Sequence, residues 1–473
     1  MKLTHSVRPI SIEGFSGIAV VAAAIFVSIA IVRENILVLA AAGAAAFVVL
    51  LPVEMSLGVF AGLVPFDQVL VLGNTEITIT AISGAFAGAA LLFYGLLSGR
   101  LKAPTRAGLC WSLFVLWTVA SIVWAIDLDT SLRRLPTVVT LFAVYIVAAT
   151  FRVTKQELSR ILMLAVLGGA AAASIIVFEF AHHVTFEGRA TLVVGSLAAN
   201  ANDLAYNLLP PLSLALSGVL QGGSLSKRGA LLAAFVTIAA SLFLTMSRGG
   251  LIALIATLLV WFFRVGVRMR VLVPILILGI SLLFSPNLFF QRMGEAFTLS
   301  EKTASGASGR GTGRYDIWLA GLHIVEDSPI TGVGLANFEV AYPKVAGYAP
   351  KLASALGYAR APHDAYLGVC AETGLVGLAL FITAIWAQMK ELRFAVSSHD
   401  SSCYSVIAIE AACWGQLLGA VSGNIQWSKS FWLVFILLAL VAHQSQESSS
   451  YSCFAFGRMQ TRHAQSPESA TPN

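Results

Sequence analysis

The chain has 473 residues, of which 57% are apolar or aromatic and only 11% are charged. Water-soluble domains carry about 25% charged residues, so this composition excludes a soluble enzyme and favours a membrane protein. The formal net charge of +6 could suggest binding to nucleic acid. Basic residues beside membrane helices more commonly set orientation, and we expect no nucleic-acid partner.

Apolar runs of the roughly 20 residues needed to cross a bilayer recur along almost the whole chain and predict an all-α, polytopic bundle of about 12 to 14 transmembrane helices. The predicted helices are Phe15–Val32, Ile36–Val53, Met55–Leu72, Ile77–Leu97, Ala107–Ile126, Leu135–Phe151, Ile161–Ala181, Leu204–Leu220, Gly229–Met246, Leu251–Phe263, Val271–Ser285, Ala365–Met389, Tyr404–Gly423 and Ser430–Ala442.

Three regions follow from this pattern. Residues 1–185 hold the N-terminal helices, and the first apolar run has no small-residue cleavage site after it, which predicts a retained helix. Residues 186–443 hold further helices and one long loop, 287–362, which we expect to carry short helices. Residues 444–473 are rich in Ser, Gln and Pro and are expected to be a disordered tail.

Lysine and arginine crowd alternate loops. With a cytoplasmic N-terminus, 17 of the 30 basic residues lie on the cytoplasmic side, 6 lie in short outside loops and the remaining 7 lie in loop 287–362. Long loops escape the positive-inside rule, so this loop does not contradict the assignment. The pattern predicts two cytoplasmic termini and a long loop on the opposite side.

Arg189 and Arg248 stand on the side where short loops should lack arginine. Arg248 lies in Ser247-Arg248-Gly249-Gly250, between two apolar helices. An arginine near membrane depth costs about 2.5 to 3.5 kcal/mol on insertion scales and commonly marks a functional site. The alternative is an arginine that extends to the lipid head groups.

The long loop contains a Gly- and Ser-rich stretch, 305–314, that lacks the lysine of a phosphate-binding P-loop. Arg314 begins a predicted helix through Glu326, amphipathic enough to lie on the membrane surface, and Gly332 and Gly334 then form a turn. The alternative is a flexible loop with an ordinary surface helix.

His363 stands at the start of the helix that follows the loop. An imidazole there could accept a proton near neutral pH, or the residue could merely begin the helix. Glu372 lies nine residues further on, about 13.5 Å along a regular helix, and is expected to serve helix packing or a polar network.

Two smaller groups complete the candidates. Asn200, Asn202 and Asp203 open a helix and are expected to cap it rather than face a ligand. His182 and His183 lack further metal ligands at useful spacing, so no metal or other cofactor is expected.

In their order, these segments resemble the O-antigen ligase and polysaccharide polymerase family. The resemblance rests on Ser247-Arg248-Gly249-Gly250, Arg314 with Trp318, the turn at 329–334, and His363 to Leu367 followed by Glu372-Thr373-Gly374. It covers about Arg189 to Gly377. Aspartate follows the histidine here, where asparagine is frequent in the family.

The resemblance implies a metal-independent membrane glycosyltransferase of the bacterial inner membrane, with loop 287–362 in the periplasm. Its donor would be a glycan on undecaprenyl pyrophosphate, and its acceptor another glycan repeat, the lipid A core or a protein side chain. Arg189, Arg248 and Arg314 would bind the pyrophosphate, and His363 would act as general base. The lack of any core-lipid signal slightly favours a polymerase over a ligase.

A transporter is the alternative from another class, because intramembrane Glu179 and Glu410 would suit a permease. Transporters often contain inverted repeats with broken helices. The sequence shows no convincing repeat, and its distinctive polar residues gather on one side of the membrane instead of at mid-membrane.

Overall fold

The computed structural model describes residues 52–71, 78–185, 188–195, 197–265, 313–345, 361–398 and 404–442. This part of the chain is helical apart from one short hairpin of β1 (Val193–Val194) and β2 (Leu197–Ala198) and two isolated bridges. Seven of its helices are long and apolar enough to cross a membrane. The predicted all-α polytopic bundle is therefore confirmed.

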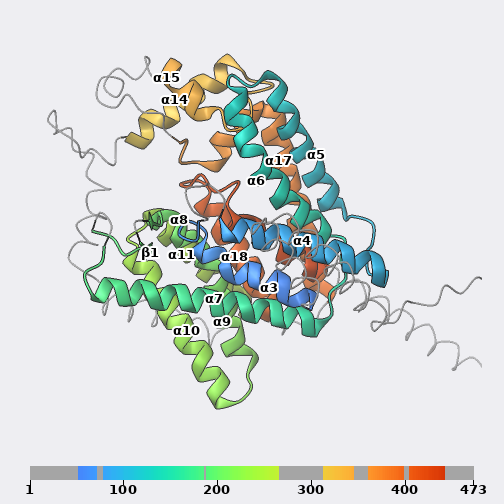
Figure 1. Ribbon diagram of the computed structural model, residues 1–473, viewed down its shortest axis with the longest axis vertical. Helices are drawn as coiled ribbons and strands as arrows, with labels where there is room; N and C mark the ends of the chain where they lie inside the picture. The colour runs from blue at the N-terminus through green and yellow to red at the C-terminus, as the bar shows by residue number, and fades with distance from the viewer. Residues whose placement is uncertain are drawn as a thin grey trace, which may run out of the picture.

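The helices run through the described segments in chain order (Figure 1). They are α3 (Val53–Leu63), α4 (Ile79–Ser98), α5 (Arg106–Ala120), α6 (Leu128–Ala148), α7 (Lys155–Ala181), α8 (Ala201–Asn207), α9 (Leu209–Gln221), α10 (Leu225–Leu244), α11 (Arg248–Val265), α14 (Gly313–Asp327), α15 (Phe338–Val345), α17 (Ala365–Ser398) and α18 (Tyr404–Gly419). Short 3-10 turns, η1 (Val64–Phe66) and η2 (Ser121–Trp124), follow α3 and α5, and a further apolar helix spans Lys429–Ala442.

Threonines begin several of these helices. Thr78, Thr105 and Thr154 cap α4, α5 and α7 through their side-chain oxygens. Thr154 and Glu157 form a complete capping box, in which each side chain accepts a hydrogen bond from the other residue's backbone. These caps set the helix starts locally.

Several predicted boundaries are wrong. Leu204–Leu220 is divided at Leu208 into two helices, because Pro210 and Pro211 lack the N–H groups that would continue the hydrogen bonds of α8. The helix predicted over Met55–Leu72 ends at Leu63, and its continuation is a 3-10 turn that contains Pro65. The predictions for Phe15–Val32, Val271–Ser285 and the 444–473 tail lie outside the described residues.

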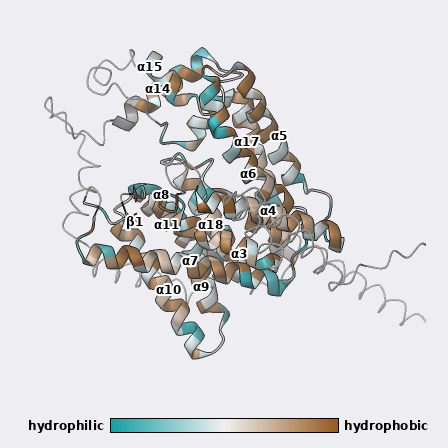
Figure 2. Cartoon of the chain, in the orientation of Figure 1, coloured by the Kyte–Doolittle hydropathy of each residue, from teal (hydrophilic) through white to brown (hydrophobic). Residues whose placement is uncertain are grey.

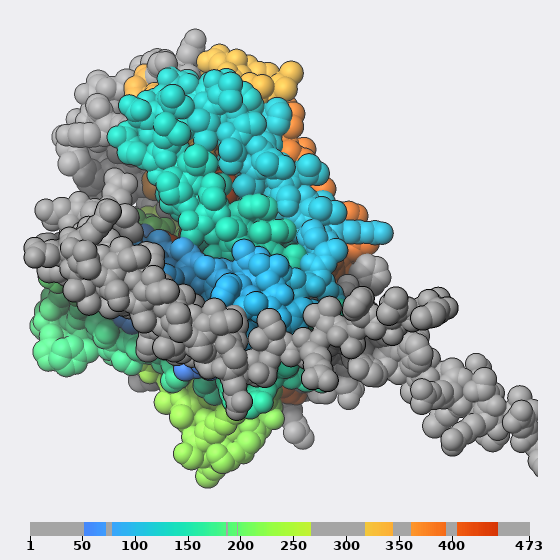
Figure 3. Space-filling model, turned by 45° about the vertical axis from the view of Figure 1, so that its right-hand side comes forward, coloured from blue at the N-terminus to red at the C-terminus, as the bar shows by residue number. Residues whose placement is uncertain are grey.

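Helices that are far apart in the sequence pack side by side in the bundle. α17 packs against α5, whereas α11 and α9 pack against α18 and α7 packs against α3 and α10. α14 and α15 lie at one end of the molecule, and the α9–α10 connection lies at the other (Figure 1). α5 and α6 cover one flank in the turned view (Figure 3).

An aromatic cluster holds the α5, α6 and α17 group together. Trp111 is fully buried and lies edge-on or tilted to Tyr145 of α6 and Phe381 of α17, at ring separations of 6.1 and 5.7 Å. It also contacts Trp432, whose ring centroid is 5.1 Å away. Such aromatic pairs add about 0.5 to 1.5 kcal/mol each beyond the area they bury.

Apolar residues predominate along the long helices (Figure 2), and large apolar side chains also face outward, as expected of a surface solvated by lipid. On α5, Leu109, Leu113 and Leu116 are 53%, 56% and 64% exposed. Their spacing places them on one face of the helix. In water a stripe of this kind would be unfavourable, whereas hydrocarbon chains solvate it.

The loop helix predicted from Arg314 to Glu326 is present as α14, but its position differs from the prediction. Ile317, Ala320 and Ile324 are buried in a small core with Phe338 of α15 and Ala371 of α17. The apolar face of α14 is therefore covered by protein, and the expectation that it lies on the membrane surface is wrong.

Candidate functional site

Arg248 is the first residue of α11. Ser247 caps this helix, because its side-chain oxygen accepts the backbone N–H of Gly250 at 3.1 Å. Gly249 lies so close to its neighbours that a Cβ atom there would be 2.1 Å from the Tyr206 hydroxyl and 2.3 Å from Ser422 Oγ. The Ser-Arg-Gly-Gly motif thus combines a cap, a cation and two residues that permit close helix packing.

The position of Arg248 suits an anion. Its side chain is half-buried, and no hydrogen bond or ion pair joins it to another residue in the described part of the chain. The free backbone N–H groups and the dipole at a helix N-terminus favour negative charge. The guanidinium and the start of α11 therefore act in the same direction.

Arg189, four residues before the β-hairpin, lies at the connection between α10 and α11, which we call the α10–α11 corner. Its Nε donates to the carbonyl of Thr245 at 2.7 Å, and a terminal nitrogen donates to Asn202 Oδ1 at 2.7 Å. The backbone N–H of Ala190 also bonds to the Leu244 carbonyl. Because Thr245 is three residues before Arg248, the structure brings these two predicted arginines together.

The polar residues at the start of α8 have separate partners. Asn200 is the N-cap, since its side chain accepts the N–H of Asn202. Asp203 accepts a hydrogen bond from Gln68 at 2.7 Å. Burial raises the pKa of the Asp203 carboxyl, and the nearby carboxylate of Asp67 raises it further. Only Asn200 is a cap by this geometry, and Asn202 instead holds Arg189.

Asp364, not His363, caps α17. Its Oδ1 accepts the N–H groups of Tyr366 and Leu367 at 2.8 and 3.0 Å. Burial raises the pKa of this carboxyl, although both hydrogen bonds oppose the change. Aspartate and asparagine are similarly good N-caps, which explains how either residue can follow the histidine.

His363 precedes this cap with a positive φ of 50°. Histidine, asparagine and aspartate are the non-glycine residues enriched in that region. The side chain is partly exposed. With the helix start satisfied by Asp364, the imidazole is not required for capping.

A third segment, residues 417–426, lies between the Arg248 corner and the His363 end of α17. On one side, Ser422 contacts the Tyr206 hydroxyl at 3.0 Å and lies against Gly249. On the other side, the Ala365 N–H donates to the Ala420 carbonyl at 2.8 Å. The two predicted parts of the site therefore share one wall, which we call the 417–426 segment.

Sequence reasoning missed the residues of this wall. Asn424 and Gln426 both lie beside Gly368, one turn into α17. The side-chain oxygen Oε1 of Gln426 is buried and has no hydrogen-bond partner among the described residues. An asparagine and a glutamine after a helical apolar run are a weak signal, since such residues are common in loops.

The turn at residues 329–334 pairs with α17 at the point where that helix is broken, and we call this pairing the joint. α17 is broken at Gly374, whose φ is 71°. The carbonyls of Ala371 and Glu372, freed by the break, accept the N–H groups of Val333 and Gly334 at 3.0 and 2.8 Å. Leu375 in turn donates to the Pro329 carbonyl at 2.8 Å. Two motifs that looked independent in the sequence are thus one structural unit.

Side chains complete the joint. Trp117 of α5 donates its indole N–H to the Thr373 carbonyl, and Trp124 donates to the carbonyl of Thr331. The buried Glu372 carboxyl lies beside the backbone N–H groups of Ala336 and Phe338, at the start of α15. These are the contacts of a polar network, as expected for Glu372.

The third predicted arginine is not brought to the corner by any described contact. Arg314 lies in the first turn of α14, and its side chain is outside the described residues. The described side chains of α14 pack on α15 and α17. In Figure 1 this helix lies at the top of the view with α15, away from α8 and α11.

Residues 233–382 match the family model described as O-antigen ligase. This match confirms the predicted O-antigen ligase family. It spans α10, α11, α14, α15 and the first half of α17, and so includes Arg248, Arg314 and His363, whereas Arg189 precedes it. The chain is a multi-pass membrane protein, and its residues 233–382 are similar to the O-antigen ligases, a family of membrane glycan ligases and polymerases. No curated protein matches the chain.

Proposed function

We propose that this O-antigen ligase family protein transfers a glycan from undecaprenyl pyrophosphate to an acceptor hydroxyl at the periplasmic face of the bacterial inner membrane. The observation that carries the proposal is the shared wall. Arg189 and Arg248 meet at the α10–α11 corner, and that corner and the His363 end of α17 both contact the 417–426 segment.

Arg248 would stabilise the leaving group. When the bond between the sugar C1 and the pyrophosphate oxygen breaks, negative charge grows on that oxygen, and fixed cations stabilise it. An arginine can donate two parallel hydrogen bonds to phosphate oxygens and stays charged. The start of α11 adds backbone N–H groups from the same direction.

Arg189 has a second task. Two of its nitrogens are committed to Thr245 and Asn202, so it fixes the backbone that presents Arg248 as well as adding positive charge. Arg314 remains a proposed third pyrophosphate ligand, supported by the family resemblance. It would approach from the periplasmic loop side, through the first turn of α14.

His363 would accept the proton of the attacking hydroxyl while the acceptor oxygen bonds to the sugar C1. Histidine suits this step because its pKa ordinarily lies near neutral pH. The leaving pyrophosphate takes the electron pair of the broken bond, so charge and atoms balance without a metal. The enzyme is accordingly proposed to be a metal-independent glycosyltransferase.

The acceptor separates a polymerase from a ligase. A polymerase passes the glycan to a second carrier-linked repeat, and a ligase passes it to lipid A core. We favour the polymerase. The test is to supply the purified protein in liposomes with a labelled glycan on undecaprenyl pyrophosphate and either acceptor in turn. Extended carrier-linked glycan with release of undecaprenyl pyrophosphate is expected. If neither acceptor causes that release, the proposed function is wrong.

A further inference from the structure

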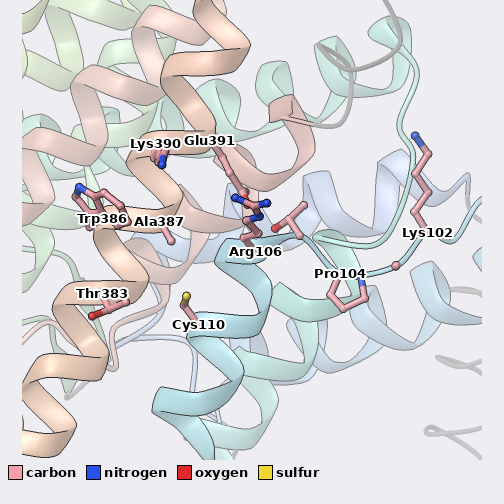
Figure 4. Close-up of a pocket in the computed structure, with 11 residues that line it drawn as sticks. Lys102, Pro104, Arg106, Cys110, Thr383, Trp386, Ala387, Lys390 and Glu391 are labelled. Atoms are coloured by element: carbon pink, nitrogen blue, oxygen red, sulfur yellow. The ribbon is translucent and has the colours of Figure 1, made fainter. Parts of the chain in front are cut away.

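A cavity of about 580 Å³ opens between the start of α5 and the second half of α17 (Figure 4). Arg106 in its lining begins the apolar span Arg106–Trp124, and Trp124 at the far end bonds to Thr331 of the 329–334 turn. At 1.5 Å per residue a span of this length covers roughly 28 Å, about the thickness of the hydrocarbon core of a bilayer. The cavity therefore lies at the opposite membrane face from the candidate site, the predicted cytoplasmic one.

Positive charge dominates the lining. Lys102, Arg106 and Lys390 contribute three cations, and Glu391 contributes one carboxylate. That carboxylate is already engaged, because its Oε1 accepts the backbone N–H of Ala107 in the first turn of α5 at 2.8 Å. The remaining charge at this end of α5 attracts an anion.

The exposed ring of Trp386 indicates that the cavity lies at the level of the lipid head groups. Trp386 is 62% exposed, and the Lys390 ammonium lies 5.0 Å from the ring centroid in a cation–π contact. Figure 4 shows the two side chains together on one turn of α17. Exposed tryptophan is enriched at the level of lipid head groups.

Apolar surface continues from the charged rim toward the membrane interior. Cys110 and Thr383 line the cavity one to two turns further along α5 and α17. Beyond them, Leu109 and Leu113 of α5 and Ile382 of α17 are about half exposed. A charged rim above an apolar track matches a molecule with an anionic head and hydrocarbon chains.

We propose that this cavity binds the phosphate head group of an anionic phospholipid. The phosphate contacts Arg106 and Lys390, and the acyl chains lie along the exposed leucines of α5. Basic pockets between membrane helices on the cytoplasmic side are suited to such head groups. A free phosphate would satisfy the cations but would leave the apolar track unused.

The test measures retained lipid by native mass spectrometry of the full-length protein in neutral detergent. Phosphatidylglycerol and phosphatidylcholine are added in separate titrations, and inorganic phosphate is added in excess as a competitor. We expect preferential retention of phosphatidylglycerol that inorganic phosphate does not reverse. Displacement by inorganic phosphate would replace the lipid by a free anion and overturn the proposal.

Variants locate the binding. Arg106→Gln with Lys390→Gln should weaken phosphatidylglycerol binding by roughly 30-fold, the loss expected for two cations at a charged surface. Lys227→Gln with Arg228→Gln removes the same charge from exposed positions at the start of α10 and should leave binding unchanged. Equal losses in both double variants would overturn the assignment. If the first does not fold, Lys390→Gln alone provides the comparison, because that side chain is exposed.

Discussion

At the scale of single residues, the two arginines of the corner differ in how they are held. Arg189 donates hydrogen bonds to Thr245 and Asn202, whereas Arg248 projects from the start of α11 without a partner among the described residues. Substitutions at the two positions should therefore differ in their effect on protein stability. This difference separates ligand binding from structural support.

Arg248→Lys should lower glycan transfer by roughly 10- to 100-fold, because lysine keeps the charge but cannot make the two-pronged phosphate contact. Its melting temperature should stay that of the unchanged protein. Arg189→Ala should lower transfer and also destabilise the protein by about 2 kcal/mol, since it leaves buried hydrogen-bond acceptors unpaired. Transfer kinetics and thermal unfolding of the purified variants check both. Normal transfer by Arg248→Lys would contradict the proposed role.

For His363, asparagine is the informative replacement. Asparagine tolerates the positive φ found here, so His363→Asn removes the imidazole without straining the backbone. If the imidazole is the general base, transfer should fall by roughly 100- to 10,000-fold while binding of the lipid pyrophosphate donor persists. Near-normal transfer would remove His363 from the mechanism.

The neighbouring cap supplies a matched control. Asp364→Asn should keep both stability and most activity, because asparagine caps as well as aspartate. Asp364→Ala should cost about 1 kcal/mol, visible as a lower melting temperature, through the loss of the bonds to Tyr366 and Leu367. If Asp364→Asn lost as much transfer activity as His363→Asn, the Asp364 carboxylate itself would take part in the chemistry.

At the scale of elements, the joint between the 329–334 turn and the broken helix α17 positions α14 and α15 against the rest of the bundle. Backbone groups that an unbroken helix would pair internally are used instead to bind residues 329–334. The carbonyls of Ala371, Glu372 and Thr373 at the break all accept hydrogen bonds from other parts of the protein, as backbone groups at membrane depth require. The joint thereby fixes the part of α17 before Gly374, which follows directly after His363 and its neighbour Asp364.

Gly374→Ala tests the joint. The new Cβ would lie 2.0 Å from the Ile330 carbonyl oxygen, and φ at this position is 71°. We expect destabilisation by about 2 to 4 kcal/mol, from the steric overlap and from the left-handed backbone. Gly229→Ala is the control, since its Cβ would meet nothing within 4 Å and alanine favours helix. Thermal unfolding in detergent is the measurement. Equal melting temperatures for the two variants would show that the joint is not required.

At the scale of the whole molecule, the proposed chemistry depends on which side of the membrane the corner faces. The distribution of lysine and arginine predicts that loop 287–362 lies in the periplasm and that both termini lie in the cytoplasm. A periplasm-dependent reporter fused after Gly347 should be active, and one fused to either terminus should be inactive. A cytoplasmic signal after Gly347 would invert the orientation and with it the proposed use of an external lipid-linked donor.

Much of this protein could be predicted from its sequence. Hydrophobicity and helix caps act over a few residues, so the composition gave the all-α membrane class, and the residues before α14 and α17 indicated where each helix begins. The ordered motifs also predicted the family. Arg189 and Arg248 were identified because an arginine beside apolar helices is conspicuous on the side that usually lacks basic residues.

The tertiary structure alone decided how those motifs are used. The pairing of Pro329–Gly334 with the break at Gly374, the commitment of Arg189 to Thr245, and the shared wall of the 417–426 segment all join residues that are far apart in the chain. Local periodicity carries no information about such contacts. They are selected by packing and by the need to pair buried backbone groups, which only the folded chain determines.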